Sequence, residues 1–192
     1  ILRYFLMRET IFGNDGNYSD ELLINRVNSD LSNDLGNLSQ RCLSMVNKHC
    51  NSKVPEKNSL KIVDQELLDL LEIKVNDILE MMDNYQINSY IEEVFNIVSL
   101  TNKYFSDQKP WELKNNDLMR MNSVLWVTVE MIRKISIMLQ PVMPESCKRL
   151  LDILCVKDDQ RTFDFIEDKF SLISGKSIKE PMIIFPKIEY KK

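Results

Sequence analysis

The chain has 192 residues, of which 44% are hydrophobic and only four are glycine, so it is long enough to bury one sizeable core. Its formal net charge of −4 argues against non-specific binding of nucleic acid through a broad basic surface. Four cysteines without a CxxC pair, a single histidine and the lack of any run of about eighteen uncharged apolar residues exclude the common zinc motifs and a membrane span, and indicate reduced thiols of an intracellular protein.

The chain begins with a predicted short helix and a turn. Residues 1–10 have helical spacing, and Leu2, Phe5 and Leu6 are expected to face inward. The charged start argues against a secretory signal, and the pattern begins in mid-element, as in a piece of a longer protein. Glycine, asparagine and aspartate at 13–16 then predict a turn.

A long helix is predicted from 19 to 49. Ser19 is followed by two acidic residues, which is the pattern of an N-cap and a first helical turn. Gly36 lies inside this helix, where glycine costs about 1 kcal/mol relative to alanine, so a close neighbour or a kink is expected there. Apolar residues at steps of three and four form one core-facing stripe: Val27, Leu31, Leu35, Leu38 and Cys42.

A second, polar row on the same helix consists of Asn33, Asn37 and Arg41 at steps of four. It lies about 120° around the helix from the apolar stripe and therefore faces solvent or a ligand. Asparagine offers a donor and an acceptor and arginine a rigid fork of donors, so Asn37 and Arg41 suit the edge of a nucleobase or a phosphate. From the spacing alone, an ordinary solvated helix face is the more frequent explanation.

The middle of the chain predicts two further helices. A loop occupies 51–59, and apolar spacing then predicts helices over 67–82 and 87–105. Asn84 is placed to cap the second of them. The wide apolar face of that second helix suits the interior of a bundle.

Trp111 is predicted to lie at a bend. Pro110 restricts its own φ and moves Lys109 out of the helical region, so the helix is interrupted there. A tryptophan at a bend either stacks on a base or anchors helix packing, and packing is the commoner role. Trp126 falls inside the next helix and is the more structural of the two tryptophans.

The last third of the chain predicts two more helices and an irregular tail. Asn116 or Asp117 opens a fourth long helix, and Pro144 lies in the first turn of a fifth. Irregular spacing follows over 157–192, with a short strand expected at 182–185. The predicted fold class is all-α: a helical bundle of about five main helices with an irregular C-terminal extension.

No catalytic set is found. With one histidine, no glycine-rich phosphate loop and no nucleophile elbow, the usual templates find no match. Adjacent carboxylates such as Glu92 and Glu93 are typical solvated groups of a helix. We therefore expect no catalytic residue, no metal site and no cofactor in this chain.

Four segments carry a family resemblance. They are LRYFLMRE at 2–9 with FGNDG at 12–16, RVNSDLSNDLGNLSQR at 26–41, NKYF at 102–105 with QKPW at 108–111, and the closing FPKI at 185–188. Together they resemble the C-terminal, anticodon-binding domain of methionyl-tRNA synthetases of the bacterial or mitochondrial type. The likeness extends over nearly the whole chain.

The resemblance implies three anticodon-binding residues: Asn37, Arg41 and Trp111. In the family pattern Trp111 stacks on the cytosine that begins the methionine anticodon, CAU. Asn37 and Arg41 would hydrogen-bond to base edges, which unpaired loop bases expose to proteins. Lys103 and Lys109 are additional candidates for contacts near the RNA backbone, placed there by us and not by the family pattern.

The resemblance also implies a division of the chain. Residues 1–18 would be a junction leading from a catalytic domain upstream, 19–156 the helical anticodon-binding bundle, and 157–192 a C-terminal extension packing back on the bundle. The longer parent protein would be a ligase that attaches methionine to tRNA using ATP with Mg²⁺. This chain lacks that catalytic domain and should be inactive alone.

The partners implied are methionine tRNA, through its anticodon loop, and the parent's own catalytic domain, with no DNA and no membrane. The expected location is the bacterial cytoplasm, with the mitochondrial matrix as the alternative. Two other functions fit the same pattern: the anticodon domain of another class I synthetase, and a non-catalytic helical scaffold that binds a protein.

Overall fold

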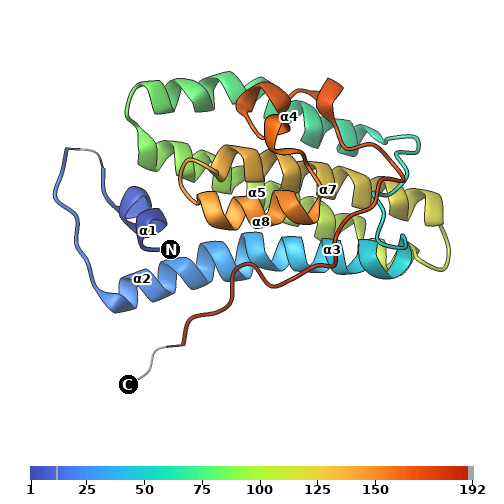
Figure 1. Ribbon diagram of the computed structural model, residues 1–192, viewed down its shortest axis with the longest axis horizontal. Helices are drawn as coiled ribbons and strands as arrows, with labels where there is room; N and C mark the ends of the chain where they lie inside the picture. Colours follow the sequence, from blue (N-terminus) through green and yellow to red (C-terminus); the bar gives the residue numbers. More distant parts are fainter. Residues whose placement is uncertain (12, 190–192) are drawn as a thin grey trace.

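The computed structural model describes residues 1–11 and 13–189 and is a bundle of helices (Figure 1). Within these residues the only β-pairing is an isolated antiparallel bridge between Lys53 and Ser177. The α-helices and the π-helical segment η1 are α1 (Leu2–Glu9), α2 (Asp20–Arg26), η1 (Val27–Gly36), α3 (Asn37–His49), α4 (Ile62–Asp83), α5 (Ile87–Gln108), α6 (Pro110–Leu113), α7 (Leu118–Leu139) and α8 (Pro144–Ile153). Three 3₁₀ turns follow: η2 (Asp158–Gln160), η3 (Phe163–Phe165) and η4 (Asp168–Phe170). The all-α class is confirmed, and the main helices are α2–η1–α3, which run on without a break, α4, α5, α7 and α8.

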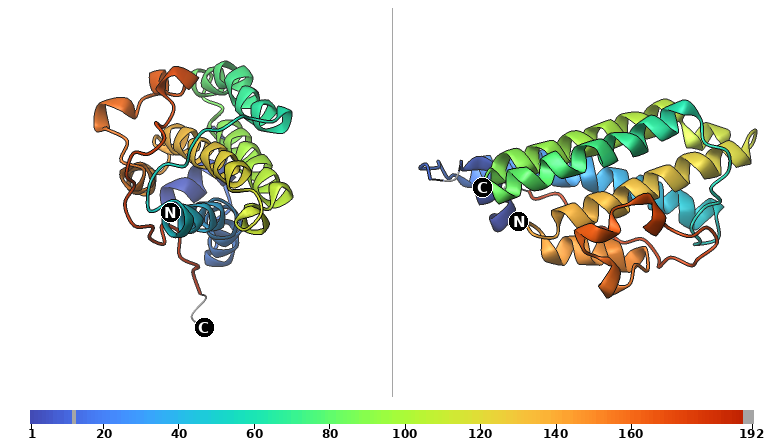
Figure 2. Two further views of the ribbon diagram at one scale, coloured as in Figure 1. Left: turned by 90° about the vertical axis from the view of Figure 1, so that its right-hand side faces the viewer. Right: turned by 90° about the horizontal axis from the view of Figure 1, so that it is seen from above.

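Helix α7 forms the centre of the bundle. It contacts α3, α4, α5 and α8, and the end-on view in Figure 2 shows these helices around it. Nearly every side chain from Met121 to Leu139 is buried, as expected for a helix with neighbours on all sides. None of the helices in the described ranges has the length and apolar composition that crossing a membrane demands.

Because α7 is surrounded, its charged residues are buried as well, and each has a partner. Arg133 binds the carboxylate of Glu130 one turn away, with contacts of 2.5–3.0 Å. Lys134 donates to Asp168 Oδ1 at 2.6 Å. Burying a charge without a partner costs far more folding free energy than burying a paired one. The charged residues of α7 can therefore lie in the centre of the bundle only because they have these partners.

The long N-terminal helix confirms the predicted stripe. Ser19 Oγ accepts from the backbone N–H of Leu22 at 3.1 Å, and the five stripe residues are fully buried. A Cβ on Gly36 would lie 2.7 Å from the Leu31 carbonyl oxygen and 3.2 Å from Phe185 Cβ. The glycine is therefore explained by the close approach of the Leu31 carbonyl in the π-helical segment η1 and by the C-terminal segment that crosses it.

The helix ends agree with the sequence except at α5. Asp117 caps α7, accepting from the backbone N–H of Arg120 at 2.9 Å, and Pro144 is the first residue of α8. The prediction that Asn84 caps the next helix is wrong. Asn84 is the C-cap of α4, and α5 begins at Ile87 after Gln86, because two further residues are needed to reverse the chain direction.

The C-terminal segment lies along the long helix (Figure 1). Ile184 and Phe185 are buried, and the side-chain amide of Asn28 exchanges two 2.9 Å hydrogen bonds with the backbone of Ile188. The short strand predicted at 182–185 is wrong, since no strand pairs with these residues in the described chain, and the backbone of Pro186 and Ile188 just after them bonds to side chains of the long helix. Phe12 of the predicted turn, and 190–192 of the predicted extension, lie outside the described residues.

The first helix packs through a face that shares only Phe5 with the one predicted. Tyr4 and Phe5 are buried, whereas Leu2 and Leu6 are exposed. The Tyr4 hydroxyl donates to Asp30 at 2.6 Å, which fastens α1 to the long helix. The inward face was therefore decided by the neighbours that α1 meets.

Candidate nucleic-acid interface

The polar row of the long helix is accessible. Asn33 and Asn37 are exposed and Arg41 is half-buried. In the described part of the chain, no hydrogen bond involves the Asn37 side chain and no carboxylate pairs with Arg41. Both side chains keep their donors, and Asn37 also its acceptor, for a ligand.

Trp111 is presented by a sharp break between α5 and α6. Lys109 ends α5 in the left-handed region, with φ 45°, and Pro110 starts α6. The indole of Trp111 is 37% exposed and meets the buried ring of Phe105 at 5.9 Å between centroids, at an angle of 60°. Trp111 is thus anchored on one side and open to solvent on another.

The structure brings Arg41 and Trp111 together. The Arg41 Cζ atom lies 5.1 Å from the ring centroid of Trp111 and also 5.1 Å from that of Phe105. Cations attract aromatic faces at such distances. Arg41 is one helical turn from Asn37, so an amide, a guanidinium and an indole share one surface.

Phe105 is the residue that sequence reasoning missed. Its place in the apolar stripe of 87–105 identifies it as a core residue, which it is. That pattern contains no signal that the same ring also supports Arg41 and Trp111. A second link is Asn102, whose side-chain amide donates to Asp34 on η1, and burial raises the pKa of that carboxyl group.

The lysines around this surface differ in whether they already pair with a carboxylate. Lys109 pairs with Glu112 at 3.4 Å, while Lys103 is exposed. At the end of α3, burial lowers the pKa of His49, and the charges of Lys48 and Lys114 lower it further. Lys48 and Lys114 are therefore close enough to His49 for their charges to act on it.

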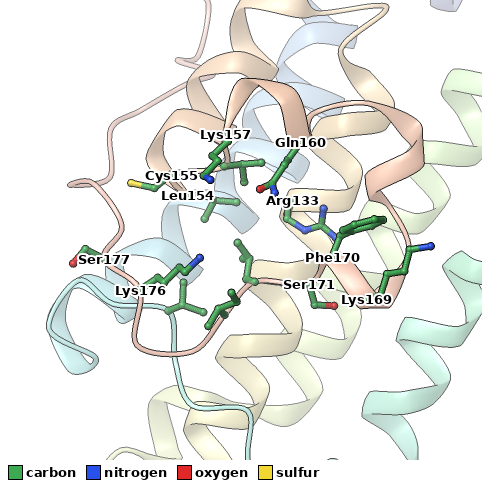
Figure 3. Close-up of a pocket in the computed structure, with 14 residues that line it drawn as sticks. Arg133, Leu154, Cys155, Lys157, Gln160, Lys169, Phe170, Ser171, Lys176 and Ser177 are labelled. Carbon is green, nitrogen blue, oxygen red and sulfur yellow. The ribbon is translucent and has the colours of Figure 1, made fainter.

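One cavity of the described residues lies away from this surface. It has a volume of about 430 Å³ and is bounded by α7, the segment after α8 and the C-terminal segment (Figure 3). Lys157 and Lys176 reach into it, but Arg133 at its wall is already neutralised by Glu130. None of Asn37, Arg41 and Trp111 lines it. Among the described residues there is also no group of histidine, cysteine and acidic side chains that could hold a metal ion.

Family models, related sequences and solved structures all match this chain to methionyl-tRNA synthetases. A family model described as the anticodon binding domain of methionyl tRNA ligase matches residues 54–192, and one described as tRNA synthetases class I (M) matches 1–43. The methionine–tRNA ligase of Brucella suis is 43% identical over 97% of this chain, and that of Rhizobium meliloti is 40% identical over 97%. The chain spans 36% of the length of each of these relatives.

Two solved structures share the fold closely. The apo form of Mycobacterium tuberculosis methionyl-tRNA synthetase has a TM-score of 0.94 at 36% identity, covering 99% of this chain and 39% of that one. The same enzyme in complex with methionyl-adenylate has a TM-score of 0.92 at 38% identity, covering 96% and 37%.

Proposed function

The chain belongs to the methionyl-tRNA synthetase family and matches its anticodon-binding domain, and we propose that it reads the CAU anticodon of methionine tRNA. The reading surface consists of Asn37, Arg41 and Trp111. One observation supports it above the others: Arg41 lies 5.1 Å from the Trp111 ring centroid, so two residues far apart in sequence form one polar and aromatic surface.

Trp111 supplies the stacking platform. An exposed indole face stacks on a splayed base with a contribution of about 1–3 kcal/mol, and the first anticodon base, a cytosine, is the base assigned to it. The edge contact with buried Phe105 holds the ring so that little side-chain freedom is lost on binding.

Asn37 and Arg41 supply hydrogen bonds to the anticodon bases. The free amide of Asn37 can pair with a base edge through its donor and its acceptor. Arg41 offers a planar fork of donors that has no carboxylate partner within the described residues. A guanidinium without an ion-pair partner also attracts the RNA backbone.

The proposed division of labour takes into account that the chain spans about a third of the length of its relatives. Residues 1–18 form the junction to a catalytic domain, 19–156 the reading bundle and 157–192 the extension. The longer parent would attach methionine to tRNA with ATP and Mg²⁺. The described residues of this chain contain no cluster suited to Mg²⁺, so we assign it no step of that chemistry. The bacterial relatives favour the bacterial cytoplasm over the mitochondrial matrix.

The test is binding of a methionine-tRNA anticodon stem-loop at fixed low salt, compared with the same RNA carrying UAU in place of CAU. We expect the native chain to prefer CAU and Trp111→Ala to lose that preference, by about 5- to 150-fold. Phe170→Ala is the matched control, because Phe170 is also 37% exposed but lies near the cavity of Figure 3.

Equal and weak binding of both RNAs by the native chain would contradict the proposal and favour the helical protein scaffold. A preference for the UAU stem-loop would also contradict the reading of CAU.

A further inference from the structure

A buried polar network joins three helices beneath the Trp111 turn. We call it the Asp64 network: Asp64 from α4, Tyr104 and Gln108 from α5, and Arg120 from α7. Arg120 Nη2 donates to Asp64 Oδ1 at 2.7 Å and to Gln108 Oε1 at 2.7 Å. The Tyr104 hydroxyl donates to Asp64 Oδ1 at 2.6 Å.

Asp64 is the centre of this network. Its side chain is 0% exposed, and its second oxygen accepts from Arg120 Nη1 and from the backbone N–H of Lys61 at 2.8 Å. Burial by itself acts to raise the pKa of Asp64, but the donors from Arg120, Tyr104 and Lys61 outweigh it and hold the pKa below its usual range. The carboxylate is therefore charged and fully hydrogen-bonded.

The Asp64 network is hydrogen-bonded to two residues in the last turn of α5. Tyr104 and Gln108 are four residues apart, so they lie on one face of the helix, and both are bonded to the Asp64–Arg120 pair. Phe105, between them in sequence, faces Arg41 and Trp111. One turn of helix thus has its polar face fixed to the network, while the buried ring of Phe105 packs against Arg41 and Trp111.

The residue that follows this turn needs such support. Lys109 has φ 45°, in a region that non-glycine side chains rarely adopt, and it precedes a proline. Backbone in a sparsely populated region persists only where the surroundings over-determine it. The bond from Arg120 to Gln108 fixes the residue just before Lys109, while Pro110 is buried just after it.

We infer that the Asp64 network, through the Arg120–Gln108 hydrogen bond, is the device that positions Trp111 for anticodon stacking. Its members are positioning residues, since none lies on the reading surface. The inference deepens the proposed function and rests on it for the role of Trp111. A directional bond to Gln108 restricts the angle at which α5 ends, which apolar packing alone specifies less closely.

Gln108→Ala is the variant that tests this, because it removes the acceptor but leaves the Asp64–Arg120 pair intact. Gln108→Glu keeps an oxygen facing Arg120 and should restore the native behaviour. Asn96→Ala is the matched control, as Asn96 is an exposed amide on the same helix, bonded only to Glu93 at 3.1 Å. The full 192-residue chain is used throughout.

Two readouts are taken on each variant. The first is ¹⁹F NMR of fluorotryptophan-labelled chain, with the Trp111 signal assigned by Trp111→Phe. The second is the affinity ratio for CAU over UAU stem-loops. In Gln108→Ala we expect a shifted or broadened Trp111 signal, an unchanged Trp126 signal, a reduced CAU preference and about fivefold weaker binding of the CAU stem-loop.

The outcomes separate the two proposals. If Gln108→Ala leaves the Trp111 signal and the CAU preference native, the positioning role is wrong while anticodon reading stands. If the native chain shows no CAU preference, anticodon reading fails, and the ¹⁹F signal still decides whether the network positions Trp111. Equal effects on the signals of both tryptophans would show a general loss of packing and would also overturn the inference.

Discussion

The two tryptophans of the chain lie in contrasting surroundings. Trp126, on α7, is 1% exposed, and its indole N–H donates to the Leu172 carbonyl at 3.2 Å. Trp111 is 37% exposed, and within the described residues its N–H has no acceptor. Both have a cation against the ring: Lys57 Nζ lies 4.3 Å from the Trp126 centroid and Arg41 Cζ 5.1 Å from that of Trp111.

The comparison shows that a cation over an aromatic ring does not by itself identify a binding site. What differs is whether the remaining polar atoms are satisfied. Trp126 has its hydrogen bond and its burial, so it stabilises the fold. Trp111 lies in the short helix that follows the left-handed residue Lys109, with an open indole and free neighbouring donors, so it has interactions left for a ligand. Four predictions follow from this difference, in decreasing order of expected effect.

Trp126→Ala should lower the free energy of unfolding by about 3–5 kcal/mol, because it leaves a large cavity in the centre of the bundle. Trp111→Ala should lower it by roughly 1 kcal/mol, since much of that side chain is already in water. Urea denaturation followed by far-UV circular dichroism measures both. Similar losses for the two variants would contradict the distinction drawn here.

Asp64→Asn should destabilise the chain by roughly 3 kcal/mol near pH 7, because it removes the charge that Arg120 pairs with in the interior. The pKa of Asp64 is below its usual range in the folded state, so its stabilising effect is complete above the ordinary value of about 3.9 and is lost as pH falls through the folded-state pKa. The measurement is the difference in unfolding free energy between native chain and variant as a function of pH. A difference that grows on acidification would contradict the sign.

Gly36→Ala should destabilise by about 1–2 kcal/mol, although alanine is the better helix former. The added Cβ would meet the Leu31 carbonyl at 2.7 Å and Phe185 at 3.2 Å, so backbone has to shift. Thermal unfolding measures the effect, and Asn33→Ala, at an exposed position of the same helix, is the control. A Gly36→Ala chain more stable than the native chain would show that the segment around Phe185 can move away from the added Cβ without loss of stability.

Arg41→Ala and Trp111→Ala should be coupled in stability by about 0.5–1 kcal/mol, the size of an exposed cation–π contact. A double-mutant cycle of unfolding free energies isolates this term. Lys57→Ala with Trp126→Phe gives the equivalent cycle around the buried tryptophan. Strict additivity of the two effects on the unfolding free energy would show that Arg41 and Trp111 do not stabilise each other.

Much of the fold was predictable because helix formation is local. The stripe of Val27, Leu31 and Leu35, the Asp117 cap and the Pro144 start all depend on residues within a turn or two of one another. The failures were places where the neighbours were distant. Tyr4 of α1 is turned inward by its distant partner Asp30. The segment after the expected strand is held by bonds from Pro186 and Ile188 to side chains of the long helix, which the local pattern does not contain.

The candidate site divides in the same way. Its residues Asn37, Arg41 and Trp111 could be named from the helical row, the Pro-Trp bend and the family resemblance, and their roles in binding stay predictions. Periodicity identified the buried face of the long helix, and Pro110 identified the break at Lys109, because backbone hydrogen bonds and steric limits act over a few residues. Only the tertiary structure brought Arg41 against Phe105 and Trp111, and only it placed Asp64 and Arg120 beneath them. Such meetings depend on how whole helices pack, which short-range spacing in the sequence does not encode.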